Sequence, residues 1–171
     1  MIPWVHLDTG SVPGGGTDLR LMQRGDEFSI LADTIELMNN RRSGSEAALA
    51  AMTCERLRDR PRARMLIGGL GMGFTLRAAL EGLGPDARVV VAELVPAVIA
   101  WARGPLAHVF GDCLDDPRVD VQESDVNRLI QAGPGQYDAI LLDVDNGPEG
   151  LMRRSNDRLY DNWGLKRARW A

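Results

Sequence analysis

The residues best suited to binding a ligand lie in one glycine-rich segment, Gly68-Gly69-Leu70-Gly71-Met72-Gly73. A turn that brings its backbone close to a ligand needs residues without side chains, because a Cβ atom would collide with the ligand or force a strained φ angle. The spacing G-x-G-x-G departs from the dinucleotide fingerprint G-x-G-x-x-G, whose last position is here Phe74. We therefore expect the turn to bind an adenosyl ligand without a pyrophosphate, through Gly68, Gly69, Leu70, Gly71 and Gly73. A turn that needs glycine only for tight packing is the alternative.

Two acidic residues follow this turn at the ends of expected strands. Glu93 lies about twenty residues past the glycines, where an acid accepts hydrogen bonds from ribose hydroxyls in related folds. Its alternative role is that of a surface acid at a strand end. Asp125 ends the third strand, from which a carboxylate can reach the amino edge of an adenine. Its alternative role is the N-cap of a helix expected at residues 126–131, and both roles could coexist.

A third acid, Asp143, ends the fourth expected strand. The carboxyl ends of strands beside the switch point of such a sheet hold reacting groups, and an acid there could orient or deprotonate an attacking amine. Asp145 adds a second carboxylate close by, and two nearby carboxylates can hold a cation and raise one another's pKa. We therefore expect Asp143 to be catalytic and Asp145 to bind the substrate. A turn rich in Asp and Asn that bonds to its own backbone is the alternative.

Alternating strands and helices must position these residues. Apolar and β-branched runs indicate strands, and helical spacing with Pro or Gly boundaries indicates helices. The expected strands cover residues 64–67, 88–92, 119–122 and 137–142, and the expected helices cover 74–83, 96–101 and 126–131. This order predicts an α/β fold with a Rossmann-like, doubly wound parallel sheet. A basic helix at 157–171 follows, so the sheet looks truncated at its C-terminal side, or a partner covers its exposed edge.

The part of the chain before the glycine turn has a different pattern. Residues 1–18 contain Pro and several Gly residues and are expected to form a flexible leader. Residues 19–42 are expected to form a β-hairpin region, with strands at 19–22, 28–31 and 34–38. A helix over residues 46–59 then opens the nucleoside-binding domain, which we expect to span 43–171. Ser43 or Ser45 can cap this helix.

Composition and charge limit the function. No apolar run approaches the ~20 residues that cross a bilayer, and the N-terminus lacks the pattern of a signal peptide, so we expect a cytoplasmic protein. Two distant cysteines and two isolated histidines indicate neither a disulfide nor a metal site. The net charge is −4, and residues 86–149 carry twelve acids against four arginines. This acidity disfavours nucleic acid and suits a cationic substrate, although an acidic solvated face is equally consistent.

With these residues placed, the chain resembles the spermidine synthase (polyamine aminopropyltransferase) family from about residue 19 to residue 165. The resemblance includes the hairpin segment, Glu46, Leu66-Ile67-Gly68-Gly69, Glu93, Asp125 and the run from Tyr137 to Asp143. It implies a class I methyltransferase-like fold, decarboxylated S-adenosylmethionine as donor, a small-molecule amine as acceptor, and a homodimer. By this resemblance Glu93 binds ribose, Asp125 binds the adenine side, Asp143 acts on the amine, and Glu46 contacts the substrate.

The chain also departs from the family pattern. An acid in the family's glycine turn, which holds the donor's amine, is replaced by Gly71 or Met72, and Ser45-Glu46 stands where the family has Tyr-His-Glu. Two further functions therefore stay open. A methyltransferase on the same fold would bind S-adenosylmethionine, whose carboxylate could use the room left by the missing acid. A non-catalytic, dimeric interaction protein would use the fold without turnover.

Overall fold

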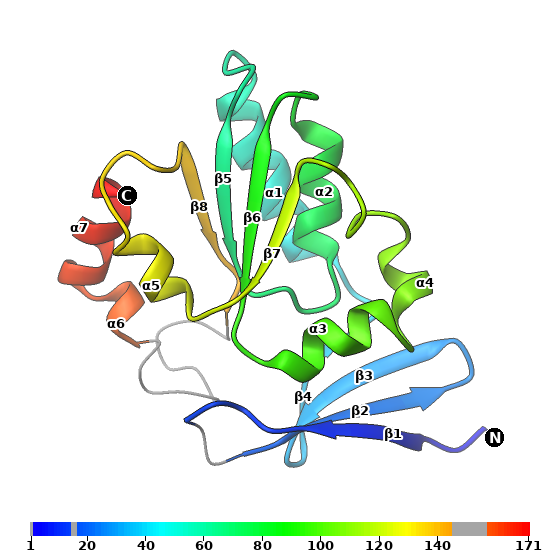
Figure 1. Ribbon diagram of the computed structural model, residues 1–171. Coiled ribbons are helices and arrows are strands. Elements are labelled where there is room, and N and C mark those ends of the chain that lie inside the picture. The colour runs from blue at the N-terminus through cyan, green and yellow to red at the C-terminus, as the bar shows by residue number, and fades with distance from the viewer. Residues whose placement is uncertain (1, 15–16, 145–156) are drawn as a thin grey trace.

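The computed structural model describes all residues except 1, 15–16 and 145–156, and these described residues form two four-stranded sheets (Figure 1). One sheet is antiparallel and is formed by the N-terminal part of the chain, residues 5–39. The other is parallel and carries helices on both faces. In Figure 1 the antiparallel sheet lies beneath the ends of the parallel strands, so a site at those ends can take residues from both sheets.

The parallel sheet has the predicted architecture. Its strands are β5 (Arg64–Gly68), β6 (Arg88–Glu93), β7 (Val119–Glu123) and β8 (Ala139–Leu142), in the spatial order β7-β6-β5-β8. Every neighbouring pair is parallel. Since β6 and β8 flank β5 on opposite sides, the strand order reverses beside β5, and a ligand crevice is expected there at the carboxyl ends of the strands. The glycine turn follows β5, and Asp143 follows β8 at this point.

Alternation along each strand divides the core between the two faces of the sheet. Met65 and Ile67 of β5 belong to the larger core cluster, which includes Leu76 and Ala79 of α2 (Phe74–Gly82). Leu66, between them, belongs to a second cluster on the other face with residues of α5 (Val126–Ile130). Each fully buried side chain of this size stabilises the fold by ~1.5–3 kcal/mol. The doubly wound arrangement predicted from the sequence is confirmed.

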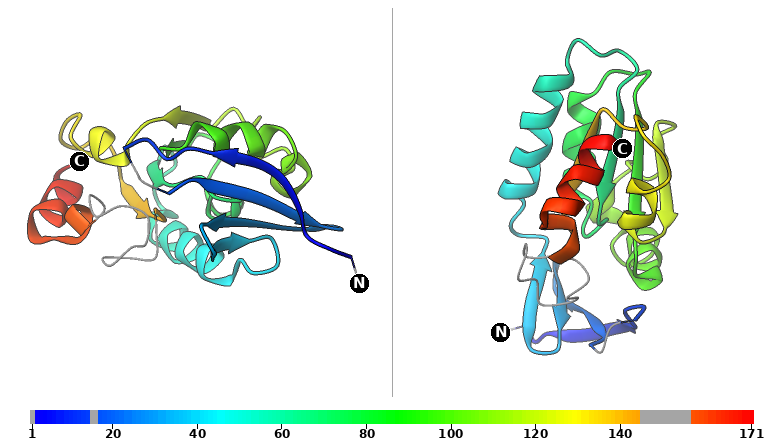
Figure 2. Two further views of the ribbon diagram at one scale, coloured as in Figure 1. Left: turned by 90° about the horizontal axis from the view of Figure 1, so that it is seen from below. Right: turned by 90° about the vertical axis from the view of Figure 1, so that its left-hand side faces the viewer.

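The remaining helices surround this sheet (Figure 2). They are α1 (Gly44–Leu57), α3 (Pro96–Arg103), α4 (Ala107–Phe110), α6 (Asp157–Tyr160) and α7 (Asn162–Trp170). Up to residue 142 the predicted elements are found with ends within about two residues of their expected bounds. The single helix expected over residues 157–171 is instead two helices, α6 and α7, because Asp161 between them has extended backbone and serves as the N-cap residue of α7. Ser43 is the N-cap residue of α1, although its side chain makes no capping hydrogen bond. None of the helices in the described part of the chain is long and apolar enough to cross a membrane.

The antiparallel sheet extends further toward the N-terminus than expected. Its strands are β1 (Val5–Gly10), β2 (Leu19–Arg24), β3 (Glu27–Ala32) and β4 (Ile35–Asn39), paired in chain order. The expectation of a flexible leader over residues 1–18 is wrong for β1, which pairs with β2 along its length. Two long-range contacts explain this. Gly10 lets β1 approach α3, since a Cβ there would overlap the Ala97 side chain, and the Trp101 indole N–H donates to Asp8 Oδ2 at 2.7 Å.

The apolar face of the antiparallel sheet packs into the larger core. Leu21, Phe28 and Ile30 are buried in the same cluster as Trp101 of α3. Four apolar residues of this sheet lie at the ends of the parallel strands: Leu19, Ile30, Leu37 and Met38. The boundary expected between residues 42 and 43 stays a prediction.

Candidate active site

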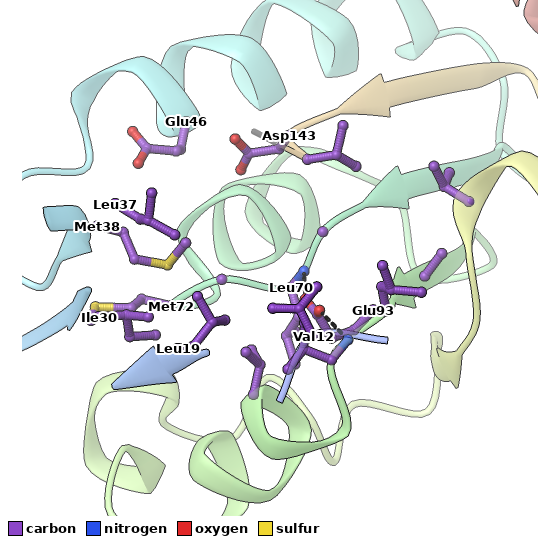
Figure 3. Close-up of a pocket in the computed structure, with 18 of the residues that line it drawn as sticks. Val12, Leu19, Ile30, Leu37, Met38, Glu46, Leu70, Met72, Glu93 and Asp143 are labelled. Atoms are coloured by element: carbon purple, nitrogen blue, oxygen red, sulfur yellow. Dashed lines mark hydrogen bonds between the residues drawn. The ribbon is translucent and has the colours of Figure 1, made fainter. Parts of the chain in front are cut away.

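A cavity of about 370 Å³ opens between the carboxyl ends of the parallel strands and the antiparallel sheet (Figure 3). Residues far apart in the sequence meet in it. The predicted site residues that line it are Gly69, Leu70, Gly71, Glu93, Asp125, Asp143 and Glu46. Gly68 and Gly73 lie beside it without lining it, and Asp145 lies outside the described residues.

The glycine turn requires glycine for its backbone. Gly69, Gly71 and Gly73 adopt φ angles of +92°, +52° and +77°, a region that residues with a Cβ rarely occupy. Packing adds a second reason. A Cβ on Gly69 would overlap the Asp143 carbonyl oxygen, and a Cβ on Gly73 would lie 2.6 Å from the Phe110 ring. Tight packing was the alternative explanation of this motif, and it accounts for the need for glycine at position 73. Gly69 and Gly71, in contrast, also line the cavity.

Replacing Gly69 with alanine is expected to lower the free energy of unfolding and to weaken nucleoside binding together. The left-handed backbone alone costs about 1–3 kcal/mol for a residue with a Cβ. The new Cβ atom would also displace the backbone of Asp143 at the end of β8. Gly135→Ala is the matched control, because Gly135 has a φ of +66° but nothing within 4 Å of its Cβ position. Denaturant unfolding and nucleoside titration measure both effects. Equal losses in the two variants would contradict the role of the Asp143 contact.

Glu93 is a buried anchor of the turn, not the surface acid of the alternative reading. Its side chain is 7% exposed, Oε2 accepts from the Leu70 N–H at 2.8 Å, and Oε1 accepts from the Val95 N–H at 2.8 Å. Burial raises the pKa of Glu93, although these backbone N–H groups favour the charged form. The carboxylate thus fixes the glycine turn to the start of α3 while it lines the cavity. Its contact with a ribose stays a prediction.

Asp125 is the N-cap residue of α5, which confirms the alternative role expected for it from the sequence. Its Oδ1 accepts from the backbone N–H of Asn127 at 2.9 Å and from the Asn127 side-chain amide at 3.1 Å. The same residue lines the cavity next to Ser124 and Val126. Because an ionised carboxylate has two oxygens that each accept more than one hydrogen bond, a cap is compatible with contact to a ligand. The adenine contact stays a prediction.

Asp143 is held by a threonine and faces a second carboxylate. The Thr75 hydroxyl donates to Asp143 Oδ2 at 2.7 Å, from the first turn of α2, and only 3% of Thr75 is exposed. Asp143 opens onto the cavity, yet protein atoms surround it closely enough that loss of hydration raises its pKa. The Thr75 hydrogen bond opposes this rise, and the negative charge of Glu46 adds to it. Figure 3 shows Glu46 and Asp143 at the same end of the cavity.

Sequence reasoning missed two parts of the site. Thr75 lies between the apolar residues Phe74 and Leu76 at the start of a helix. A polar residue in this apolar segment was the only local sign of its role. The apolar residues that the antiparallel sheet contributes to the cavity were also missed, because alternation in a hairpin shows that one face is buried but not what it contacts. These residues are Leu19, Ile30, Leu37 and Met38. Among the described residues, no group of three or more His, Cys, Asp or Glu side chains could hold a metal ion.

Comparison with known proteins gives relatives of one kind. No family model matches the chain. A polyamine aminopropyltransferase of Corynebacterium efficiens is 38% identical over 114 residues, which is 65% of this chain and 21% of the relative. Polyamine aminopropyltransferase 2 of Pseudomonas aeruginosa is 33% identical over 94 residues, which is 53% of this chain and 26% of the relative. The matches thus span about a quarter or less of these relatives' own length. The resemblance inferred from the motifs is confirmed.

Solved structures give the same fold. A spermidine synthase in complex with the transition state analogue AdoDATO superposes with a TM-score of 0.64 at 20% identity, over 81% of this chain and 47% of that one. The spermidine synthase of Thermotoga maritima gives a TM-score of 0.63 at 20% identity, with 81% and 46% covered. The described part of the chain therefore has a mixed α/β, class I methyltransferase-like fold that corresponds to less than half of those structures.

Proposed function

We propose that this protein binds decarboxylated S-adenosylmethionine and its product methylthioadenosine, and transfers an aminopropyl group to a small-molecule amine. The observation that carries the proposal is the meeting of a positive-φ glycine turn, Glu93, Asp125 and Asp143 in one cavity at the carboxyl ends of the parallel strands. The names of the relatives support the reaction, and the nucleoside analogue bound by a structural neighbour supports the ligand class.

The residues divide into a nucleoside side and a reacting side. On the nucleoside side, the close backbone of the glycine turn receives the adenosyl group, Glu93 accepts from the ribose hydroxyls and Asp125 accepts from the adenine amino group. On the reacting side, Asp143 is fixed by Thr75 and faces Glu46. Two carboxylates at one end of the cavity favour the binding of a cationic amine there.

The chemical step is a displacement at the methylene beside the sulfonium. The amine nitrogen forms a C–N bond, the C–S bond breaks, and its electron pair stays on sulfur to give the neutral thioether methylthioadenosine. The attacking amine releases one proton, which Asp143 accepts. Most of the rate comes from holding nitrogen and sulfonium in line, and proton transfer contributes about 10²–10⁴-fold.

Product analysis tests this proposal. Incubation with decarboxylated S-adenosylmethionine and an amine is expected to release methylthioadenosine in proportion to the alkylated amine. The same incubation with S-adenosylmethionine is expected to release no S-adenosylhomocysteine. Release of S-adenosylhomocysteine alone would instead establish a methyltransferase. Failure of both reactions with folded, nucleoside-binding protein would favour a non-catalytic interaction protein.

The cellular location, the oligomeric state and the partners of the protein are part of the same proposal. We propose a cytoplasmic homodimer that requires no metal and binds no nucleic acid. The acidic balance of residues 86–149 supports the exclusion of nucleic acid. The topology supports a dimer, because none of the described strands pairs with the outer edge of β8. Light scattering at several concentrations measures the mass in solution, and a monomeric mass throughout would contradict the dimer.

The pH dependence of turnover is expected to shift in opposite directions in two variants. Asp143 must be ionised to accept a proton, so kcat/KM falls as the pH drops through its raised pKa. Glu46→Gln removes a negative charge that raises this pKa, so the acidic limb moves to lower pH. Thr75→Val removes a hydrogen bond that favours the charged form, so the limb moves to higher pH. Profiles of kcat/KM against pH measure both shifts, and displacement of both limbs in the same direction would contradict the assignment.

A further inference from the structure

Strand β1 is attached to α3 by a hydrogen bond between a carboxylate and a buried tryptophan. The indole N–H of Trp101, a residue that is 2% exposed, donates to Asp8 Oδ2 at 2.7 Å. This hydrogen bond holds the pKa of the Asp8 carboxyl below its usual value, so the acceptor is charged at neutral pH. Hydrogen bonds to an ionised acceptor are stronger than those between neutral groups. The close approach of Gly10 to Ala97 brings the strand onto the same helix.

Helix α3 connects this attachment to the candidate active site. Val95, its N-cap residue, and Val98 line the cavity, and Trp101 follows Val98 one turn further along the helix. The Val95 N–H also donates to Glu93 Oε1, while Glu93 Oε2 holds the Leu70 N–H of the glycine turn. Because backbone hydrogen bonds join the turns of a helix, a shift at Trp101 carries the cavity residues with it.

Strand β1 also leads directly into a residue of the cavity. Val12 follows the end of β1 by two positions and lines the cavity. Figure 3 shows Val12 beside Leu70 and Glu93, at the nucleoside end. Loss of the Asp8 contact would therefore disturb this end from two directions, through α3 and through the segment that follows β1.

We propose that Asp8 is a positioning residue of the nucleoside site, which acts through Trp101 to hold α3 and Val12 in the arrangement that binds the nucleoside. The inference rests on the proposed function, because it concerns the same ligand. Coupling between two parts of a protein is reciprocal. If the attachment of β1 strengthens nucleoside binding, the bound nucleoside strengthens the attachment of β1 by the same factor.

Substitutions at the two ends of this hydrogen bond give the first test, by calorimetric titration with methylthioadenosine. Asp8→Ala removes the acceptor and is expected to weaken binding about fivefold, the factor of one ordinary hydrogen bond. Asp8→Asn keeps a carbonyl oxygen that can accept from the indole, so its affinity is expected to stay within about twofold of the unmodified protein. Trp101→Phe removes the donor and keeps a ring in the core, so it is expected to match Asp8→Ala.

The double variant and an exposed tryptophan complete this test. Asp8→Ala combined with Trp101→Phe is expected to lose no more affinity than either single variant, because both remove the same contact. Trp163→Phe is the matched control, since Trp163 is 68% exposed on α7 and does not line the cavity. Binding by Asp8→Ala within about twofold of the unmodified protein would overturn the inference, and so would additive losses in the double variant.

Hydrogen exchange on the unmodified protein gives a second test that needs no substitution. Saturation with methylthioadenosine is expected to slow exchange of the β1 amides at least about fivefold, and to leave the amides of α7 unchanged. Unchanged exchange of β1 would overturn the inference even if Asp8→Ala fails to fold. Absence of methylthioadenosine binding to the folded protein removes the proposed function and the inference with it. Binding without coupling to Asp8 or β1 leaves the proposed function standing and removes only the inference.

Discussion

Asp143→Asn is expected to lower kcat for aminopropyl transfer by about 10²–10⁴-fold while methylthioadenosine binds within about threefold of the unmodified protein. The amide keeps the shape of the carboxylate and can still accept the Thr75 hydrogen bond, so the turn and strand ends keep their positions. It removes the group that accepts the proton of the attacking amine and half of the charge that faces the ammonium. Single-turnover kinetics and nucleoside titration separate these effects.

A surface aspartate provides the control for this substitution. Asp115 has an 82% exposed side chain and forms an ion pair with Arg103 at 3.6 Å, away from the cavity. Asp115→Asn is expected to change neither kcat nor nucleoside affinity, because exposed ion pairs contribute about 0–1 kcal/mol. A kcat for Asp143→Asn within about threefold of the unmodified protein would show that this carboxylate takes no part in the reaction.

Glu93→Gln is expected to destabilise the fold by about 1–3 kcal/mol and to weaken methylthioadenosine binding at least about tenfold. Both oxygens of Glu93 accept backbone N–H groups in a buried position, and a glutamine replaces one oxygen by an NH2 donor. Either the Leu70 or the Val95 N–H then loses its acceptor. The glycine turn is released at the point where it approaches the ligand.

Glu123→Gln is the matched control for Glu93→Gln. Glu123 is the register partner of Glu93 on the neighbouring strand β7, but its side chain is exposed. This substitution is expected to leave both the free energy of unfolding and the nucleoside affinity within experimental error. Denaturant unfolding and calorimetry provide the two readouts. Similar losses in both variants would mean that Glu93 has no special role in the turn.

The elements that hold the nucleoside side of the site could be predicted because their signals are local. The β-branched run of residues 89–91 indicates a buried parallel strand, and the glycine spacing after residues 64–68 indicates a close turn. Once the strand order is known, Glu93, Asp125 and Asp143 must meet at one edge. The likeness of the chain to known enzymes was found from these same residues.

The rest of the site could not be predicted to the same depth, because its contacts are long-range. The place of β1 depends on Gly10 fitting against Ala97 and on Asp8 reaching Trp101, which lies 93 residues later. The cavity takes apolar residues from β2, β3 and β4 because the antiparallel sheet packs over the strand ends, and the sequence of the hairpin carries no sign of that packing. Thr75 likewise acquires its role only when β8 brings Asp143 beside α2.

A calorimetric titration of the folded protein with methylthioadenosine tests most directly whether the glycine turn and Glu93 form a nucleoside site. We predict saturable binding of one nucleoside per chain, weakened at least about tenfold by Glu93→Gln and unchanged by Glu123→Gln. Absence of binding to the folded, unmodified protein, or equal binding by the Glu93→Gln variant, would contradict that assignment.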